Sequence, residues 1–86
     1  MFTEERQAID QIDRQMVRLF EERLTVVSRI GRKKQELGLP ILDAEREQAV
    51  LDKVCGYLEN EAYAPYVKKL YQEIMDLAKD YQQQES

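Results

Sequence analysis

One long segment without a proline sets the main limit on how this chain can fold. No proline occurs between Thr3 and Pro40, and apolar residues recur throughout, so the sequence predicts one helix from about Thr3 to Leu37, ended by Gly38 and Pro40. At 1.5 Å of rise per residue this helix is about 50 Å long. A compact monomer of 86 residues is only roughly 30 Å across. The helix must therefore project from its own chain and find a partner.

The apolar residues of this helix follow a spacing of three and four from end to end, as a seam against other helices does. They are Ile9, Ile12, Met16, Leu19, Val26 or Val27, Ile30 and Leu37, which we call the apolar stripe. A homodimer with paired long helices would cover it. A coiled-coil or bundle core would explain such a stripe completely, so the stripe alone says nothing about function.

Two shorter helices are expected after the long one. Thr3 is the expected N-cap of the first helix and Asp43 that of a second helix over about Ala44–Glu59. Pro65 suits the first turn of a third helix over about Pro65–Gln83, with residues 82–84 fraying as a glutamine tail. No alternating strand pattern is present. The expected fold is all-α, a single domain over residues 1–86, with three helices per chain, one long and two shorter, in an intertwined homodimer.

The composition excludes several classes of function. With 13 Lys and Arg against 17 Asp and Glu, the net charge of −4 has the wrong sign for binding nucleic acid or an anionic membrane. The chain has no His, which removes a His general base, a His-dependent triad and the commonest metal ligand. The single Cys55 can form neither an internal disulfide nor a zinc cluster. We therefore expect no metal site. With no apolar signal segment and no membrane span either, we expect a cytoplasmic protein.

Two cations interrupt the apolar stripe of the long helix. Arg23 occupies the stripe position between Leu19 and Val26, and Lys34 lies one turn past Ile30 on nearly the same azimuth. Their separation is about 16 Å of helical rise, so both side chains can lean toward one pocket. Burying a cation without a counter-charge costs several kcal/mol, so something negative must meet these two.

The two shorter helices carry matching polar groups on their inward faces. Extending the apolar face of the second helix toward its start reaches Glu47 and then Asp43, with Arg46 at the edge. On the third helix, Gln82 lies one turn beyond Ala78, at the rim of the apolar face. Internal salt bridges that fix helix register are one explanation of this cluster. We favour a cavity for an anionic small molecule, because buried ion pairs contribute little net stability.

Arg6 stands on the flank of the stripe near the start of the long helix. It lies about 25 Å along the helix from Arg23, too far to share a site on the same chain. In an antiparallel dimer it can reach the partner's site.

The positions of these charges follow a pattern. Arg6 precedes Asp13 by seven residues, and Arg23 follows that Asp by ten. Gly31 and Lys34 come next along the chain. Residues 40–47 follow, where a Pro precedes Asp43 and the adjacent Arg46 and Glu47. The last position of the pattern is Gln82. In this combination the sequence resembles the all-helical class of chorismate mutases across essentially its whole length.

The resemblance implies conversion of chorismate to prephenate in phenylalanine and tyrosine biosynthesis, a cofactor-independent Claisen rearrangement. It also implies roles for individual residues. Arg23 and, from the other subunit, Arg6 would clamp the two substrate carboxylates, with Arg46 supporting the carboxylate end. Lys34 and Gln82 would face the ether oxygen. Glu47, helped by Asp43, would hold the ring hydroxyl.

One position departs from the family pattern. Many members have a small hydroxylic residue one turn before the helical Gln, where this chain has Ala78. The resemblance therefore implies a substrate-binding position that lacks one hydroxyl contact, without loss of the charged clamp.

Two other functions fit the same pattern of residues. One is a lyase of the same fold that removes pyruvate from isochorismate with a similar set of cations; Glu47 argues for the mutase. The other is a non-catalytic helical dimerisation module, in which the inward charges are register-setting salt bridges.

Overall fold

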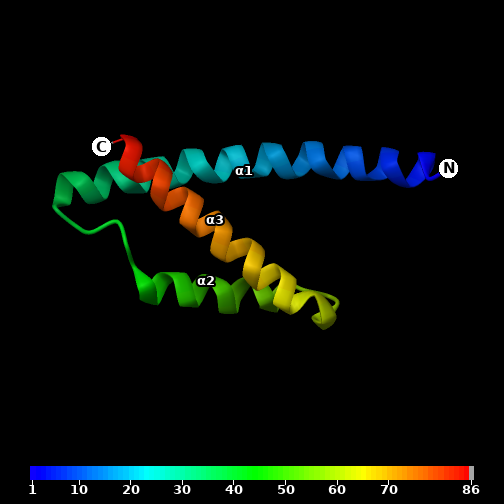
Figure 1. The fold of residues 1–86 in the computed structure, drawn as a ribbon. Coiled ribbons are helices and arrows are strands. Elements are labelled where there is room, and N and C mark those ends of the chain that lie inside the picture. The colour runs from blue at the N-terminus through cyan, green and yellow to red at the C-terminus, as the bar shows by residue number, and fades with distance from the viewer. Residues whose placement is uncertain (86) are drawn as a thin grey trace.

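The computed structural model describes residues 1–85. All the regular secondary structure in this range is helical. They are α1 (Thr3–Leu37), α2 (Ala44–Gly56), a short 3-10 helix η1 (Glu61–Tyr63) and α3 (Ala64–Glu85). Figure 1 shows the C-terminal end of α3 crossing the C-terminal half of α1, while the N-terminal part of α3 lies beside α2. The expected all-α fold with one long and two shorter α-helices is confirmed.

Helix α1 has the predicted bounds, but its first turn is not capped as expected. The N-cap is Phe2, in the left-handed region at φ 63°, and no side chain caps the helix there. The predicted cap at Thr3 is wrong, because the Phe2 carbonyl already accepts the Arg6 N–H at 2.9 Å and Thr3 is inside the helix. At the other end, Gly38 adopts φ 69° and donates its N–H to the Gln35 carbonyl, as helix-terminating glycines do.

The two shorter helices differ from their predicted ranges at their ends. Helix α2 stops at Gly56 rather than Glu59, because the N–H groups of Tyr57 and Leu58 bond three residues back and tighten the last turn. Asn60 then accepts the N–H of Ala62 and begins η1. Helix α3 starts one residue before Pro65, which lies in its first turn as expected.

The predicted fraying of residues 82–84 is also wrong, because all three are helical and Gln82 is buried. Its amide anchors this end of α3 against α1.

The core of the single chain is small. Val54, Met75 and Ala78 are the buried apolar residues among those described, and they lie where α2 and α3 meet. The chain has a radius of gyration of 15.7 Å and a longest dimension of 54 Å. Figure 1 shows the N-terminal half of α1 extending beyond the other helices. The prediction that this helix projects from its own chain is confirmed.

Most of the apolar stripe on α1 is uncovered in one chain. Ile9 and Ile12 are each 53% exposed and Leu19 is 62% exposed. A run of exposed apolar side chains on one helix face is typical of an interaction surface. Within the described residues, no helix has the length and apolar character needed to cross a membrane.

Candidate functional site

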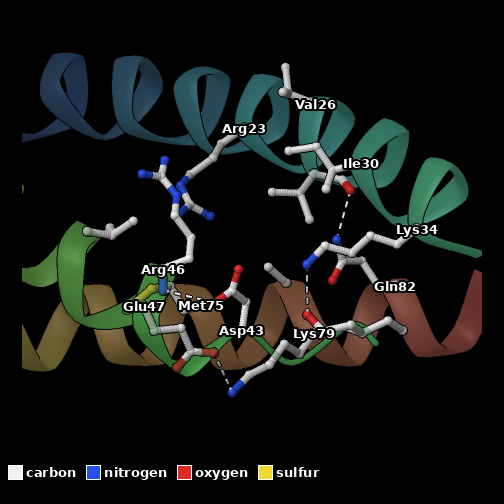
Figure 2. Close-up of a pocket in the computed structure, with 14 residues that line it drawn as sticks. Arg23, Val26, Ile30, Lys34, Asp43, Arg46, Glu47, Met75, Lys79 and Gln82 are labelled. Atoms are coloured by element: carbon white, nitrogen blue, oxygen red, sulfur yellow. Dashed lines mark hydrogen bonds and ion pairs between the residues drawn. The ribbon is translucent and has the colours of Figure 1, made fainter. Parts of the chain in front are cut away.

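A pocket of about 280 Å³ lies between the C-terminal half of α1, the start of α2 and the C-terminal half of α3. Figure 2 shows its side chains converging from all three helices. The structure brings seven of the eight predicted site residues to its lining: Arg23, Lys34, Asp43, Arg46, Glu47, Ala78 and Gln82.

Arg6 is the predicted site residue that the chain does not bring to the pocket. It is exposed near the start of α1, in the part of the helix that projects beyond α2 and α3. This position agrees with the expectation that Arg6 is too far away to serve the site of its own chain.

Arg23 reaches into the pocket from α1 without a counter-charge. Its Nη1 is buried and has no hydrogen-bond partner among the described residues. Its Cζ lies 6.0 Å from the centre of the Tyr71 ring, at the limit of a cation–π contact. Figure 2 shows Arg46 reaching up from α2, so guanidinium groups from two helices line the pocket. An unpaired buried donor beside a second cation favours an anionic ligand between them.

Lys34 is held at the other end of the pocket by the segment between α1 and α2. Its Nζ donates a hydrogen bond to the Ile41 carbonyl at 3.1 Å, which leaves two further N–H groups available. Figure 2 shows Lys34 and Gln82 close to each other at this end. A cation and an amide that converge in this way can stabilise negative charge developing on a ligand oxygen.

The two carboxylates of the pocket have different environments. Asp43 is exposed and caps α2, since its Oδ1 accepts the N–H of Arg46 at 3.0 Å, as the sequence predicts. Glu47 is half-buried, and its Oε2 pairs with Lys79 Nζ at 2.9 Å. In the described part of the chain neither carboxylate forms an ion pair with Arg23 or Lys34, so the register-setting salt bridges of the alternative interpretation are not formed there.

Lys79 lines the pocket and was not among the predicted site residues. The hydrogen bond to Glu47 raises the pKa of Lys79 above its ordinary value of 10.5. The signal that could have identified it is the helical spacing of Met75, Ala78, Lys79 and Gln82, which places all four on one face of α3.

Gln82 is buried in the core, whereas the sequence placed it at the rim of the apolar face of its helix. It is 9% exposed, and its Nε2 donates to the Val27 carbonyl on α1 at 2.9 Å. Gly31 makes this close approach possible, because a Cβ there would lie 3.0 Å from Gln82 Cγ. Ala78, one turn earlier, is 5% exposed and contributes only a methyl group to the wall.

The charges that line the pocket do not cancel. Four cations, namely Arg23, Lys34, Arg46 and Lys79, face two carboxylates, a surplus of two positive charges in a chain whose net charge is −4. The remaining lining is mostly apolar, with Val26, Ile30 and Val50 among it. Among the described residues no group of three or more Asp, Glu, Cys or His side chains could hold a metal ion. The pocket therefore suits a small, doubly anionic molecule with an apolar body.

Residues 5–83 match the family described as chorismate mutase type II. The chain belongs to this family. The match covers every residue named above as a predicted site residue, including Arg6 and Gln82.

Three curated proteins show related segments. The chain is 48% identical to the T-protein of Haemophilus influenzae over 46 residues, which is 54% of this chain and 12% of that protein. It is 40% identical over 58 residues to the bifunctional chorismate mutase/prephenate dehydratase of Aquifex aeolicus, which is 67% of this chain and 16% of that protein. It is 37% identical over 49 residues to the chorismate mutase of Methanocaldococcus jannaschii, which is 57% of this chain and 50% of that protein. The matches thus span half or less of each relative.

The contact between Gly31 and Gln82 can be tested by substitution. In Gly31→Ala the Gln82 side chain, which is bonded to the Val27 carbonyl, must shift by a few tenths of an ångström, so we expect a lower melting temperature despite the better helix propensity of Ala. Gly56→Ala is the matched control, because a Cβ there meets nothing within 4 Å; it should stabilise the fold by about 0.5 kcal/mol. Equal stabilisation by both substitutions in thermal unfolding would show that Gln82 is not held against α1.

Proposed function

We propose that this protein is a chorismate mutase that rearranges chorismate to prephenate for phenylalanine and tyrosine biosynthesis. The observation that carries the proposal is the buried Arg23 Nη1, which finds no hydrogen-bond partner in residues 1–85, in a pocket with two surplus positive charges. Chorismate carries two carboxylates on a largely apolar ring, which matches this charge and lining. Membership of the chorismate mutase type II family supports the same substrate.

The proposed reaction requires the protein only to bind the substrate and to stabilise charge. The ether C–O bond breaks as a new C–C bond forms within one molecule, so no nucleophile, cofactor or obligate proton transfer takes part. The protein must hold the reactive conformer and stabilise the negative charge that develops on the ether oxygen. A site built from cations and an amide, in a chain without His, is sufficient for this reaction.

The pocket suggests a role for each end of the substrate. We assign Arg23 and Arg46 to the carboxylates, since guanidinium groups bind carboxylates bidentately. Lys34 and Gln82 face the ether oxygen; Gln82 uses one N–H for the Val27 carbonyl and keeps the other for the ligand. Glu47, helped by Asp43, accepts the hydrogen bond of the ring hydroxyl.

The site is completed, in this proposal, by a second copy of the chain. The exposed apolar stripe of α1 gives the copies a face to share, and an antiparallel pairing of the two long helices brings Arg6 of one copy to the pocket of the other. Arg6 then adds a third guanidinium to the two that already face the carboxylate end. We also place the protein in the cytoplasm, where the free thiol of Cys55 would remain reduced.

Offering both candidate substrates tests the proposed activity directly. With chorismate, we expect its absorbance to fall as prephenate forms, with no pyruvate released. Isochorismate is the control substrate, because the lyase of the same fold would release pyruvate from it. Faster pyruvate release from isochorismate than prephenate formation from chorismate would overturn the mutase assignment.

The roles of Arg23 and Lys34 separate an enzyme from a dimerisation module. Because neither cation pairs with a carboxylate of the described residues, Arg23→Ala and Lys34→Ala should leave the fold intact. Each should lower kcat/KM by a factor of about 10² to 10³, which corresponds to about 3 to 4 kcal/mol of transition-state stabilisation, the scale of a lost contact to a developing oxyanion. The measurement is a melting curve beside a rate assay. A dimerisation module predicts the reverse, with a marked loss of stability in Arg23→Ala.

Mixing two inactive variants tests whether Arg6 is donated across subunits. Arg6→Ala and Lys34→Ala homodimers should each be inactive, whereas a heterodimer contains one site with neither substitution. We expect mixed and re-equilibrated subunits to regain about a quarter of the parent activity, since half of the dimers are mixed and each has one intact site of two. No regain in a verified heterodimer would show that each chain uses its own Arg6.

A further inference from the structure

Lys79 joins the pocket to a polar network between α2 and α3. Its Nζ lies 2.9 Å from Glu47 Oε2 and 3.3 Å from Asp76 Oδ1. On the same face of α3, Gln72 Nε2 lies 3.1 Å from Asp76 Oδ1 and 3.5 Å from Glu47 Oε1. Both oxygens of Glu47 are therefore contacted from α3, one by an ammonium and the other by an amide.

This arrangement restricts the Glu47 side chain while leaving it at the pocket wall. The side chains of Lys79 and Glu47 are 26% and 20% exposed, so the pair is neither buried nor freely solvated. Figure 2 shows the pair below the pocket, with Lys79 extending along α3 toward Glu47 on α2. Asp76 is not a lining residue, so it holds Lys79 from outside the pocket.

A carboxylate in this pocket presents an electrostatic problem. Glu47 must remain an anion to accept a hydrogen bond from a substrate hydroxyl, yet an anion repels a doubly charged ligand. A cation bonded to the face of Glu47 that the ligand does not use answers both requirements, because it favours the ionised carboxylate and cancels its field.

We propose that Lys79 is a positioning residue that orients Glu47 as a hydrogen-bond acceptor and offsets its repulsion of a dianionic substrate. This inference rests on the proposed chorismate mutase activity. Lys79 itself need not contact the substrate.

Charged groups on every helix around the pocket act on this pair. Those that line it or contact the pair are Arg23 and Lys34 from α1, Asp43 and Arg46 from α2, and Asp76 from α3. Arg23, Lys34 and Arg46 are also cations. Lys79 is therefore distinguished by its direct bond to Glu47 rather than by its charge alone.

The protonation state of Lys79 suits this role. Because its pKa is raised, Lys79 keeps its charge below the ordinary Lys pKa of 10.5 and loses it only as the pH rises through the raised value. A change in activity on the acid side therefore does not come from titration of Lys79.

Kinetics of Lys79→Gln in the full-length protein test the inference. Losing the cation should raise KM for chorismate about fivefold, the upper range for a partly exposed charge pair, with a smaller change in kcat. Because a neighbouring cation favours the ionised form of a carboxyl group, its loss should also move the acid limb of the kcat/KM profile to higher pH. Lys79→Arg keeps the charge and should restore most of both properties.

Two further variants separate this role from a general effect of charge. Lys69→Gln removes the same charge from an exposed position on α3 and should leave both KM and the acid limb unchanged. In a Glu47→Gln background, Lys79→Gln should no longer move the acid limb. Where that background is too slow to assay, a carbon NMR titration of the Glu47 carboxyl in ligand-free Lys79→Gln and parent protein measures the same shift.

The outcomes distinguish failure of the inference from failure of the proposed function. An active parent whose KM and acid limb are the same in Lys79→Gln overturns the inference alone. A parent inactive on chorismate overturns the proposed function, while the NMR titration still reports whether Lys79 controls Glu47. Equal effects of Lys69→Gln and Lys79→Gln would mean that only net charge matters, and would also overturn the positioning role.

Discussion

The central physical constraint in this structure is a guanidinium placed between helices without a counter-charge. Arg23 lies on the apolar side of α1, and its Nη1 is buried with no partner among the described residues. Such a group lowers the stability of the chain that carries it, because its lost hydration is not replaced. A ligand of the kind we propose would supply the missing acceptor, whereas Arg46 is exposed on α2 and can remain hydrated.

The rest of the site depends on how α3 is seated against α1. Gly31 lets α3 approach closely enough for the Gln82 amide to reach the Val27 carbonyl. The same seating turns Lys79 toward Glu47 on α2. One contact between helices thus positions an amide at one end of the pocket and a carboxylate–ammonium pair at another, which keeps the space between Arg23 and Arg46 open.

The sequence predicted the long helix and most of the pocket because both follow from local signals along the helices. The end of α1 follows from Gly38 and Pro40, and the N-cap at Asp43 follows from its residue type. The inward azimuths of Arg23, Lys34 and Glu47 follow from counting residues along a helix. The face of α3 was predicted less accurately: Gln82 was expected at the rim of the apolar face, but it is 9% exposed and buried together with Met75. The face is rotated toward Met75, Lys79 and Gln82, because the tertiary contact of Gln82 with α1 decides it. Helix propensity could not reveal that contact, so the partner of Glu47 was missed.

The small core links the stability of this chain to its proposed activity. Val54, Met75 and Ala78 bury too little apolar surface to stabilise an 86-residue chain comfortably, while several side chains of the apolar stripe remain about half exposed. If a second copy covers the stripe, as we propose, the association that supplies the missing apolar burial also delivers Arg6 to the pocket. Folding and completion of the site would then be one event, and the uncompensated charge of Arg23 would be tolerated because the dimer, rather than the monomer, sets the stability. In that case the interface on this face would cover the exposed apolar side chains and stabilise a chain whose own core is small.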